Sequence, residues 1–257
     1  MMPDFVGKSL ALSADGLADV AQKLGVGSAE IQTVVSVETH GAGFLQDRRP
    51  QILFERHFFS RLTQGAYDAS HPGISSPTPG GYGMGGANQY VRLAEAVALN
   101  RHAALMSASW GIGQVMGANF AVAGFPDVET MVADMCDSED AQLAAVGGFI
   151  LGNKLNRFLA VHDWQSFARG YNGANYVINH YDVQLNGFYQ KINAGASPDL
   201  HVRSAQVYLT FNNLDPHGID GSMGPGTRSA LIEFQTAQNL SQSGEADDPT
   251  MAALLPV

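Results

Sequence analysis

The stretch Ile31-Gln-Thr-Val-Val-Ser-Val-Glu38, which continues as Thr39-His40-Gly41-Ala42-Gly43-Phe44, decides how the first part of this chain is interpreted. If the stretch is helical, the apolar side chains seven, four and three residues before Glu38 share its face. The pattern predicts a carboxyl at the edge of a core, where glycines end the helix. Because burial raises the pKa of a carboxyl, such a residue can keep its proton and act as a general acid for glycosidic cleavage. The alternative is an ordinary Glu in the last helical turn that reaches water.

The composition is that of a folded protein with a sizeable core. Its 257 residues are 45% hydrophobic and 15% charged, which is enough chain for one large or two modest domains. The net charge is -10 and no basic stripe is present, which argues against nucleic acid as a partner. The single Cys136 excludes an intrachain disulfide and a cysteine-based zinc site, and no HExxH spacing occurs. We therefore expect no metal and no cofactor.

The N-terminus and the apolar runs bear on where the protein is made. Residues 1–8 lack the basic region and the apolar stretch of a secretory signal. No apolar run reaches the ~18 residues that a membrane span needs. We expect a monomer that is made soluble in a cytoplasm and does not insert into a membrane, so that action outside would need separate export or release.

Turn-forming residues divide the chain into two parts. Ala194-Gly-Ala-Ser-Pro-Asp199 has the composition of a short linker. We expect a first domain over residues 1–193, a linker over 194–200 and a separate small unit over 201–257. The predicted fold class is mainly α, with a small β element in the first domain and three helices in the last unit.

Several elements of the first domain are predicted from periodicity. Residues 138–161 are expected to form one long helix, which is apolar nearly all round and therefore central, and residues 175–192 a helix that closes the domain. Residues 51–57 are strand-like or begin a short helix. Six Gly and three Pro between His71 and Gly86 predict a long irregular loop, either a cleft wall or a mobile lid.

The last unit carries an ordered set of turn and helix residues. These are Gly218-Ile-Asp220-Gly221-Ser-Met-Gly-Pro-Gly-Thr227, then Ala230-Leu231, Phe234-Gln235, Leu240, Gly244 and Thr250. Across nearly the whole unit, this set resembles the bacterial peptidoglycan-binding domain built on three helices. The resemblance implies cell-wall anchoring, and the alternative is a merely structural module. Candidate contacts with peptidoglycan are Asp220, Gly221, Thr227 and Gln235.

Four motifs occur in order along the first domain. They are Val37-Glu38-Thr39 with Gly41-Ala-Gly-Phe44; Arg49-Pro50-Gln-Ile52-Leu53-Phe54-Glu55-Arg56-His57-Phe-Phe59; Ser109-Trp110-Gly111-Ile-Gly113-Gln114-Val115-Met116-Gly117; and Arg169-Gly-Tyr171-Asn172-Gly173. With these motifs, residues 15–193 resemble the phage and bacterial N-acetylmuramidases of the lysozyme-like superfamily, which are related to goose-type lysozymes and soluble lytic transglycosylases. The resemblance implies a lysozyme-like helical catalytic domain.

The same resemblance implies that Glu38 is the acid that protonates the leaving oxygen of the glycosidic bond. A second carboxylate would stabilise the positive charge that develops on the sugar. Glu55 is the favoured candidate because it lies within the second motif, and Asp47 is the other. Glu55 is alternatively a buried structural carboxylate paired with Arg49, Arg56 or a backbone donor. Asp47 is alternatively a solvated loop acid.

Five further residues of the third and fourth motifs are candidates for binding sugar. Gln114 follows two glycines that allow close backbone approach, and its amide could bind an N-acetyl group or orient a water. Tyr171 and Asn172 offer a stacking ring and hydrogen bonds, or they form an ordinary helix end. Trp110, beside Ser109, either lines the floor of the cleft or belongs to the core.

Together the two resemblances imply a modular peptidoglycan hydrolase that cuts the β-1,4 bond between N-acetylmuramic acid and N-acetylglucosamine and is anchored by its last unit. It resembles phage endolysins of Gram-negative hosts. Such a protein would accumulate in the host bacterial cytoplasm and reach the periplasmic peptidoglycan after holin-assisted release. The alternatives are a lytic transglycosylase that forms anhydro-muramoyl ends and a non-catalytic, wall-binding structural protein.

Overall fold

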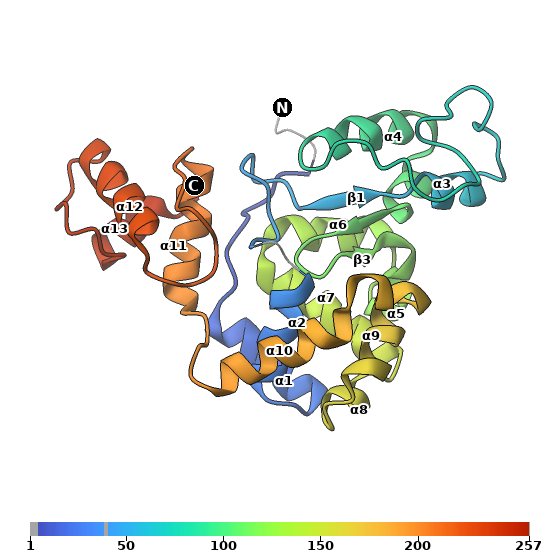
Figure 1. Cartoon of the computed structure of the whole chain (residues 1–257). Helices are drawn as coiled ribbons and strands as arrows, with labels where there is room; N and C mark the ends of the chain where they lie inside the picture. Colours follow the sequence, from blue (N-terminus) through green and yellow to red (C-terminus); the bar gives the residue numbers. More distant parts are fainter. Residues whose placement is uncertain (1–4, 39–40, 257) are drawn as a thin grey trace.

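The structure, a computed structural model that describes residues 5–38 and 41–256, consists of a large helical domain and a small three-helix domain (Figure 1). The elements of the large domain are α1 (Ala14–Leu24), α2 (Ser28–Glu38), β1 (Ile52–Phe54), α3 (Arg56–Leu62), α4 (Asn88–Met106), β2 (Ala108–Trp110), β3 (Val115–Met116), η1 (Gly117–Asn119), α5 (Phe120–Ala123), α6 (Val128–Asp137), α7 (Glu139–Gly152), α8 (Asn156–Leu159), α9 (Trp164–Asn172), η2 (Ala174–Asn179) and α10 (Tyr181–Asn193). Those of the small domain are α11 (Leu200–Phe211), α12 (Pro225–Ala237) and α13 (Asp248–Leu254). The predicted fold class, mainly α with a small β element, is confirmed.

Helix α7 is central to the large domain, where it packs against α1, α5 and α6. The hydroxyl of Ser138 caps its first turn by accepting a hydrogen bond from the backbone N–H of Ala141. Helix α2 packs against α1 and α10, and its buried side chains include Ile31, Val34 and Val37. The apolar face predicted for α2 therefore lies in the core, and the helix ends at Glu38 on the surface of that core.

The predicted helix over residues 138–161 is wrong in length, because the structure breaks it. Helix α7 ends at Gly152, and Lys154 has a left-handed backbone with φ 57° before α8 begins. The side-chain amide of Asn153 donates to the carbonyl of Phe149 and so satisfies one of the last helical carbonyls. Hydrophobic periodicity carries no information about such a cap. The predicted helix therefore extended beyond Gly152, where α7 ends.

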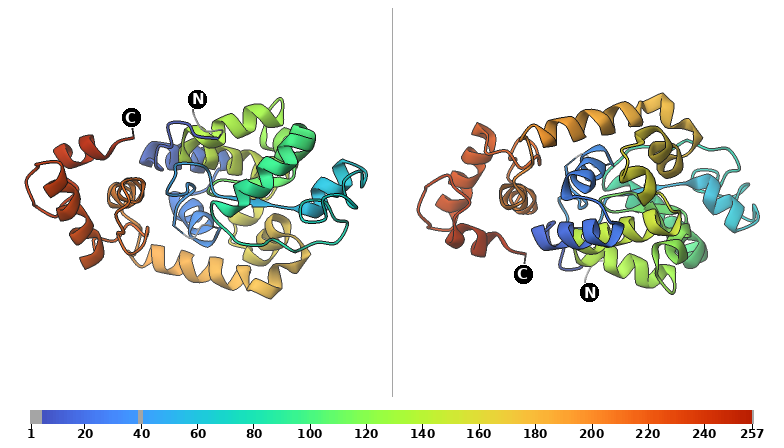
Figure 2. Two further views of the ribbon diagram at one scale, coloured as in Figure 1. Left: turned by 90° about the horizontal axis from the view of Figure 1, so that it is seen from above. Right: turned by 90° about the horizontal axis from the view of Figure 1, so that it is seen from below.

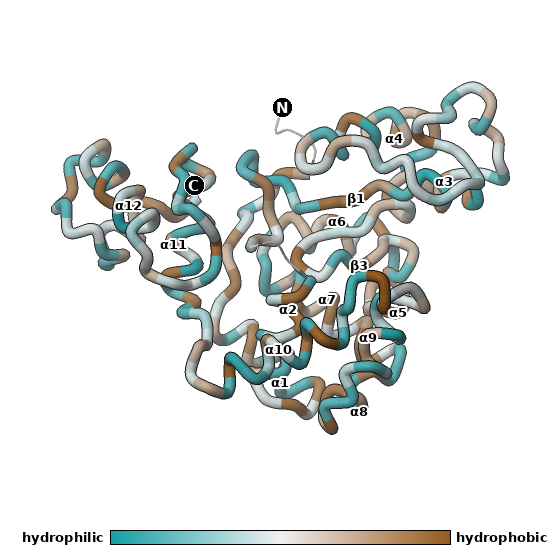
Figure 3. Tube along the Cα trace, viewed as in Figure 1, coloured by the Kyte–Doolittle hydropathy of each residue, from teal (hydrophilic) through white to brown (hydrophobic). Residues whose placement is uncertain are grey.

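A similar break divides the predicted helix over residues 175–192. His180 has a left-handed backbone with φ 52° and separates the 3-10 helix η2 from α10. Figure 3 shows hydrophobic and hydrophilic residues alternating along α10, whose buried side chains include Leu185 and Ile192. The break turns the chain between α9 and α10, two helices that pack against each other.

The small β element is a three-stranded antiparallel sheet in the order β1-β2-β3. Leu53 pairs with Ser109, and Trp110 pairs with Val115, so the second and third sequence motifs lie side by side. The run 51–57 forms both predicted alternatives in succession, a strand and then the start of α3. The sheet thus brings Glu55 and the Gly-rich hairpin to the same region of the domain.

The small domain lies at one side of the large one and is reached through α10 (Figure 2). Its core contains buried side chains of α11 and α12, among them Leu209, Leu231 and Phe234. Ala11 and Ala42 of the large domain belong to the same apolar cluster. The two domains therefore touch through a shared apolar contact. The expected boundaries remain a prediction, with α10 ending at Asn193 and α11 beginning at Leu200.

Candidate active site

Glu38, the last residue of α2, lines a cleft of about 720 Å³ in the large domain. The side chain is half-buried. Burial raises its pKa from 4.5 to about 7, although a hydrogen bond from Asn172 acts in the opposite direction. A carboxyl with this pKa holds its proton over much of the neutral range, as a general acid must. Thr39, the next residue of the first motif, lies outside the described residues.

The cleft is built from segments that are far apart in the sequence. Helix α2 supplies Glu38, the sheet and its hairpin form one wall, and the segment from α9 to α10 forms another. The lining residues are Glu38, Ala42, Gln51, Ile52, Leu53, Glu55, Tyr82, Gly85, Gly86, Ser109, Gly111, Ile112, Gly113, Gln114, Met116, Tyr171, Asn172, Tyr176, Asn179 and Tyr181. All four sequence motifs of the first domain therefore contribute to one cleft.

Asn172 and Tyr171, at the end of α9, are positioned directly against the acid and the hairpin. The side-chain amide of Asn172 donates to Oε1 of Glu38 over 2.8 Å. The hydroxyl of Tyr171 donates to the carbonyl of Gly113 over 2.8 Å, which ties α9 to the hairpin. Burial, and to a smaller extent the charge of Glu38, raises the pKa of Tyr171 well above its usual value. Oδ1 of Asn172 is buried and has no hydrogen-bond partner among the described residues.

Glu55 lies in the same cleft as Glu38, at the start of α3. Its backbone N–H donates to the carbonyl of Ser107 over 2.8 Å, which fixes the residue at the end of β1. Oε2 of Glu55 lies 3.1 Å from Nδ1 of His57, and its side chain is 16% exposed. The pKa of Tyr82 is raised by burial and then by the charge and hydrogen bond of Glu55. Glu55 therefore contacts His57 and Tyr82, whereas the sequence had suggested Arg49, Arg56 or a backbone donor as its partner.

Two candidates lie away from the cleft. Asp47 is exposed, pairs with Arg49 at 2.5 Å, and is not among the lining residues. Trp110 is fully buried, and its indole N–H donates to the carbonyl of Leu105 over 3.1 Å. The structure thus places Asp47 as the solvated loop acid and Trp110 in the core, the alternatives that the sequence left open.

Ser109 and Gln114 line the cleft, but their polar groups form hydrogen bonds within the sheet and its hairpin. The hydroxyl of Ser109 donates to Oε1 of Gln114 over 2.8 Å. The amide of Gln114 donates to the carbonyls of Gly111 and Gln51, over 2.9 and 3.3 Å. Gln114 also has a left-handed backbone, with φ 48°. These hydrogen bonds of Gln114 stabilise the turn. Contact between its side chain and an N-acetyl group remains a prediction.

The loop over residues 71–86 contributes lining residues that sequence reasoning did not name. Tyr82 is one of them, and its carbonyl accepts hydrogen bonds from the side chains of Gln89 and Arg92, over 2.7 and 2.6 Å. Arg92 also donates to the carbonyl of Gly73 over 2.8 Å. These bonds join the loop to α4, which favours the cleft wall over the lid. Tyr176 and Tyr181 were also missed, although aromatic residues recur after Tyr171 in the sequence.

In the small domain, the four predicted contact residues have different environments. Asp220 is exposed, and its carboxylate accepts hydrogen bonds from the backbone of Ser222 and the side chain of Gln206. Gly221 has a left-handed backbone at the turn, with φ 73°, which glycine adopts without strain. Thr227 and Gln235 are 2% and 0% exposed. Of the four, Asp220 alone has an exposed side chain, whereas Thr227 and Gln235 lie in the core of the domain, and contact with peptidoglycan remains a prediction.

Metal-binding clusters and membrane-spanning helices were sought in residues 5–38 and 41–256, the part of the chain that the structure describes. In these ranges, no group of three or more His, Cys, Asp or Glu side chains is arranged to hold a metal ion. No helix in the same ranges has the length and apolar character needed to cross a membrane.

Comparison with known proteins agrees with the arrangement of the cleft and the small domain. Residues 27–193 match the family described as N-acetylmuramidase, and residues 199–254 match the putative peptidoglycan binding domain. Among solved structures, the chain is similar to one described as the crystal structure of Burkholderia AP3 phage endolysin. The identity is 38% and the TM-score 0.68, over 72% of each chain. No curated protein matches the chain.

Proposed function

The chain belongs to the N-acetylmuramidase family, and from this premise we propose that it hydrolyses the β-1,4 bond between N-acetylmuramic acid and N-acetylglucosamine. A peptidoglycan hydrolase is the broader class that the family, the small domain and the similarity to a phage endolysin support. The observation that carries the specific proposal is Glu38, a half-buried carboxyl with a pKa near 7 in the cleft.

In the proposed reaction, Glu38 donates its proton to the glycosidic oxygen as the bond to the sugar breaks. The hydrogen bond from Asn172 orients the carboxyl without removing its proton, since burial outweighs it in setting the pKa. Glu55 is the second carboxylate in the cleft and either stabilises the positive charge on the sugar or activates the attacking water. The water adds its oxygen to the sugar carbon and gives its proton either to the deprotonated Glu38 directly or to Glu55, in which case Glu38 regains a proton from solvent.

The test of this proposal is Glu38→Gln, assayed on purified peptidoglycan by loss of turbidity and by new reducing ends. Glutamine keeps the size of the side chain but has no proton of suitable acidity to donate. We expect turnover to fall by about 10²–10⁴-fold. Asp47→Asn is the matched control, because it removes an exposed carboxylate outside the cleft. A Glu38→Gln protein that clears peptidoglycan as fast as the wild type would refute the role of the acid.

A second candidate is a lytic transglycosylase, which the direct bond from Asn172 to Glu38 favours because the Tyr-Asn-Gly element is typical of that class. Such an enzyme forms an anhydro-muramoyl end with one carboxyl and no water. The presence of Glu55 in the cleft favours hydrolysis instead. Mass spectrometry of the digest separates the two, since anhydro ends without reducing ends would exclude the hydrolase.

We further propose that the small domain anchors the enzyme to the cell wall and that the protein acts as an endolysin. In that role it accumulates in the host cytoplasm and reaches the periplasmic peptidoglycan with the help of a holin. The match to the putative peptidoglycan binding domain and the similarity to a phage endolysin support this role. Expression with and without a holin in a Gram-negative host tests it, and lysis that is independent of the holin would contradict it. A purely structural wall-binding protein would bind peptidoglycan without clearing it.

A further inference from the structure

A buried ion pair joins the two domains. Arg203 of α11 contacts Glu139, the first residue of α7, through two hydrogen bonds: Nη1 to Oε2 over 2.5 Å and Nη2 to Oε1 over 2.9 Å. The side chains are 5% and 0% exposed. Although burial opposes its charge, the guanidinium of Arg203 and the backbone N–H groups around it hold the pKa of Glu139 below its usual value. The pair is therefore fully charged and almost free of solvent at neutral pH.

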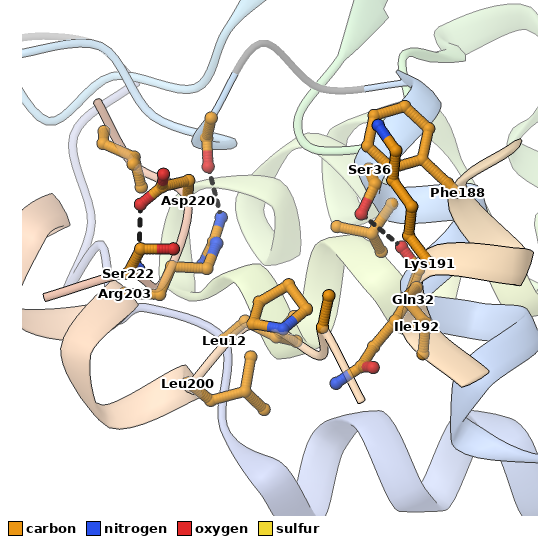
Figure 4. Close-up of a pocket in the computed structure, with 15 residues that line it drawn as sticks. Leu12, Gln32, Ser36, Phe188, Lys191, Ile192, Leu200, Arg203, Asp220 and Ser222 are labelled. Carbon is orange, nitrogen blue, oxygen red and sulfur yellow. Dashed lines mark hydrogen bonds between the residues drawn. The ribbon is translucent and has the colours of Figure 1, made fainter. Parts of the chain in front are cut away.

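The same two side chains hold the segment that follows Glu38. Glu139 accepts a hydrogen bond from the N–H of Gly43 over 2.6 Å. Arg203 donates from Nη2 to the carbonyl of Gly41 over 2.7 Å, a bond that Figure 4 shows reaching from the arginine to the backbone above it. We refer to Arg203, Glu139, Gly41 and Gly43 as the interdomain junction. It fixes both ends of a three-residue segment whose middle residue is Ala42.

Ala42 connects the junction to the catalytic cleft. It lines the cleft together with Glu38, and it also belongs to the apolar cluster of the small domain. On the other side of the segment, a Cβ placed on Gly41 would lie 3.1 Å from the Cβ of Ile219 in the small domain. The small domain therefore packs against the segment that contains Ala42, a residue of the catalytic cleft, and forms a hydrogen bond with it.

The cavity beside the junction does not present a separate ligand site. It has a volume of about 620 Å³ and is lined by residues of both domains (Figure 4). Its polar side chains are largely bonded within the protein: Asp220 accepts from Ser222, and Ser36 donates to the carbonyl of Gln32. The ammonium of Lys191, another lining residue, lies 5.4 Å from the ring centroid of Phe188. Each of these contacts lies within one domain, so the polar groups are already paired locally.

We propose that Arg203 is a positioning residue for the reaction at Glu38. By holding Gly41 and Glu139, the wall-binding domain sets the segment after the catalytic acid, so the cleft has its active shape only when that domain is docked. The inference rests on the proposed peptidoglycan hydrolase function. A buried charge that loses its partner also destabilises a protein, so the test must separate positioning from stability.

The test compares three full-length variants with the wild type. Arg203→Met removes the arginine, Arg203→Met with Glu139→Gln removes both charges, and Arg228→Met removes the exposed ion pair with Glu245 as a control in the same domain. Each protein is measured for kcat and KM on soluble, peptide-free oligomers of the alternating glycan, for thermal stability and for co-sedimentation with purified peptidoglycan. The soluble oligomers report the cleft without requiring anchoring to a wall.

We expect Arg203→Met to lower both kcat and the melting temperature, while Arg228→Met changes neither. In the double variant no buried charge is left unpaired, so the melting temperature should recover. Its kcat should stay at least ~10-fold below that of the wild type, because a misplaced catalytic segment costs rate even in a stable protein. Co-sedimentation should stay within about twofold of the wild type in the double variant, since anchoring does not use the junction.

Two results would overturn the inference. If kcat of the double variant recovers together with its melting temperature, Arg203 contributes stability alone. If wild-type kcat is retained in Arg203→Met itself, the junction has no influence on the cleft. A wild-type protein that leaves the glycan oligomers uncut would instead refute the proposed function, and the inference with it.

Discussion

Asn172 donates a hydrogen bond from Nδ2 to Oε1 of Glu38 over 2.8 Å, which joins the end of α9 to the end of α2. The bond lowers the pKa of Glu38, whereas burial raises it more strongly, to about 7. The acidity of the proposed catalytic group is therefore a balance between two contributions, and each can be changed separately.

Removing the hydrogen bond should shift the activity profile to higher pH. In Asn172→Leu, the pKa of Glu38 loses the contribution that lowers it and gains further burial, so it rises above about 7. A general acid works only while protonated, so activity falls as pH rises through this pKa. The alkaline limb of kcat against pH should move upward while the maximal rate falls. A limb at the wild-type pH would show that another group controls it.

Glu38 should also make the protein less stable at high pH. Its pKa is about 7 in the folded protein and has the ordinary value of 4.5 in the unfolded chain, so the folded state binds more protons between these values. The free energy of unfolding therefore decreases as pH rises through that window and is level above it. Glu38→Gln should remove this cost and stabilise the protein at pH 8 by roughly 3 kcal/mol, with little difference near pH 4. Urea unfolding at the two pH values measures both quantities, and equal stability of the two proteins at pH 8 would contradict the buried environment.

Glu55→Gln should reduce turnover strongly if Glu55 is the second carboxylate. The expected loss is about 10²–10⁴-fold in kcat, because the developing charge or the water would lose its partner. His57→Gln should have a smaller effect, since His57 lies 3.1 Å from Glu55 and acts on the substrate only through it. Near-normal kcat in Glu55→Gln, measured on the glycan oligomers, would reduce Glu55 to a structural residue.

A methyl group at Gly43 should disrupt the segment beside the cleft. A Cβ there would lie 1.9 Å from Oε1 of Gln142, a buried side chain that also accepts a hydrogen bond from Ile112. Gly43→Ala should cost at least ~2 kcal/mol of stability, because a buried hydrogen bond must break or the segment must move. Gly187→Ala is the matched control, since its Cβ would meet open space within α10 and should stabilise the helix slightly. Comparable thermal melts of the two variants would contradict the packing around Gly43.

Gln235→Ala should unfold the small domain before it affects any contact with peptidoglycan. The side chain is fully buried, and it bonds to Ser243, Glu245, Thr250 and the N–H of Gly244 over about 3.0 Å. Losing these partners should cost about 2–3 kcal/mol, with weaker wall binding only as the domain unfolds. Asp220→Ala, at an exposed position, tests binding directly by co-sedimentation. Wall binding lost in a fully stable Gln235→Ala protein would make Gln235 a contact residue after all.

The local features of this protein were predictable because each depends on residues close together in the chain. Ile31 and Val34 place Glu38 on an apolar helical face, and the Asp220-Gly221 pair is typical of a tight turn, where the structure has φ 73° at Gly221. Helix ends were less predictable. The cap by Asn153 and the left-handed residue His180 depend on side-chain and backbone geometry that periodicity does not encode.

The sequence by itself determined the class of chemistry. A carboxyl on an apolar helical face and the ordered motifs around it can be recognised from the order of residues along the chain. Only the tertiary structure decided which residues share the cleft. It placed Glu55 in the same cleft as Glu38 and joined Asn172 to Glu38 by a hydrogen bond. It also kept Trp110 and Asp47 away from the cleft and paired Arg203 with Glu139 across the two domains. Such contacts join residues that no local pattern relates. They follow from how the helices pack, and burial within that packing also sets the acidity of Glu38.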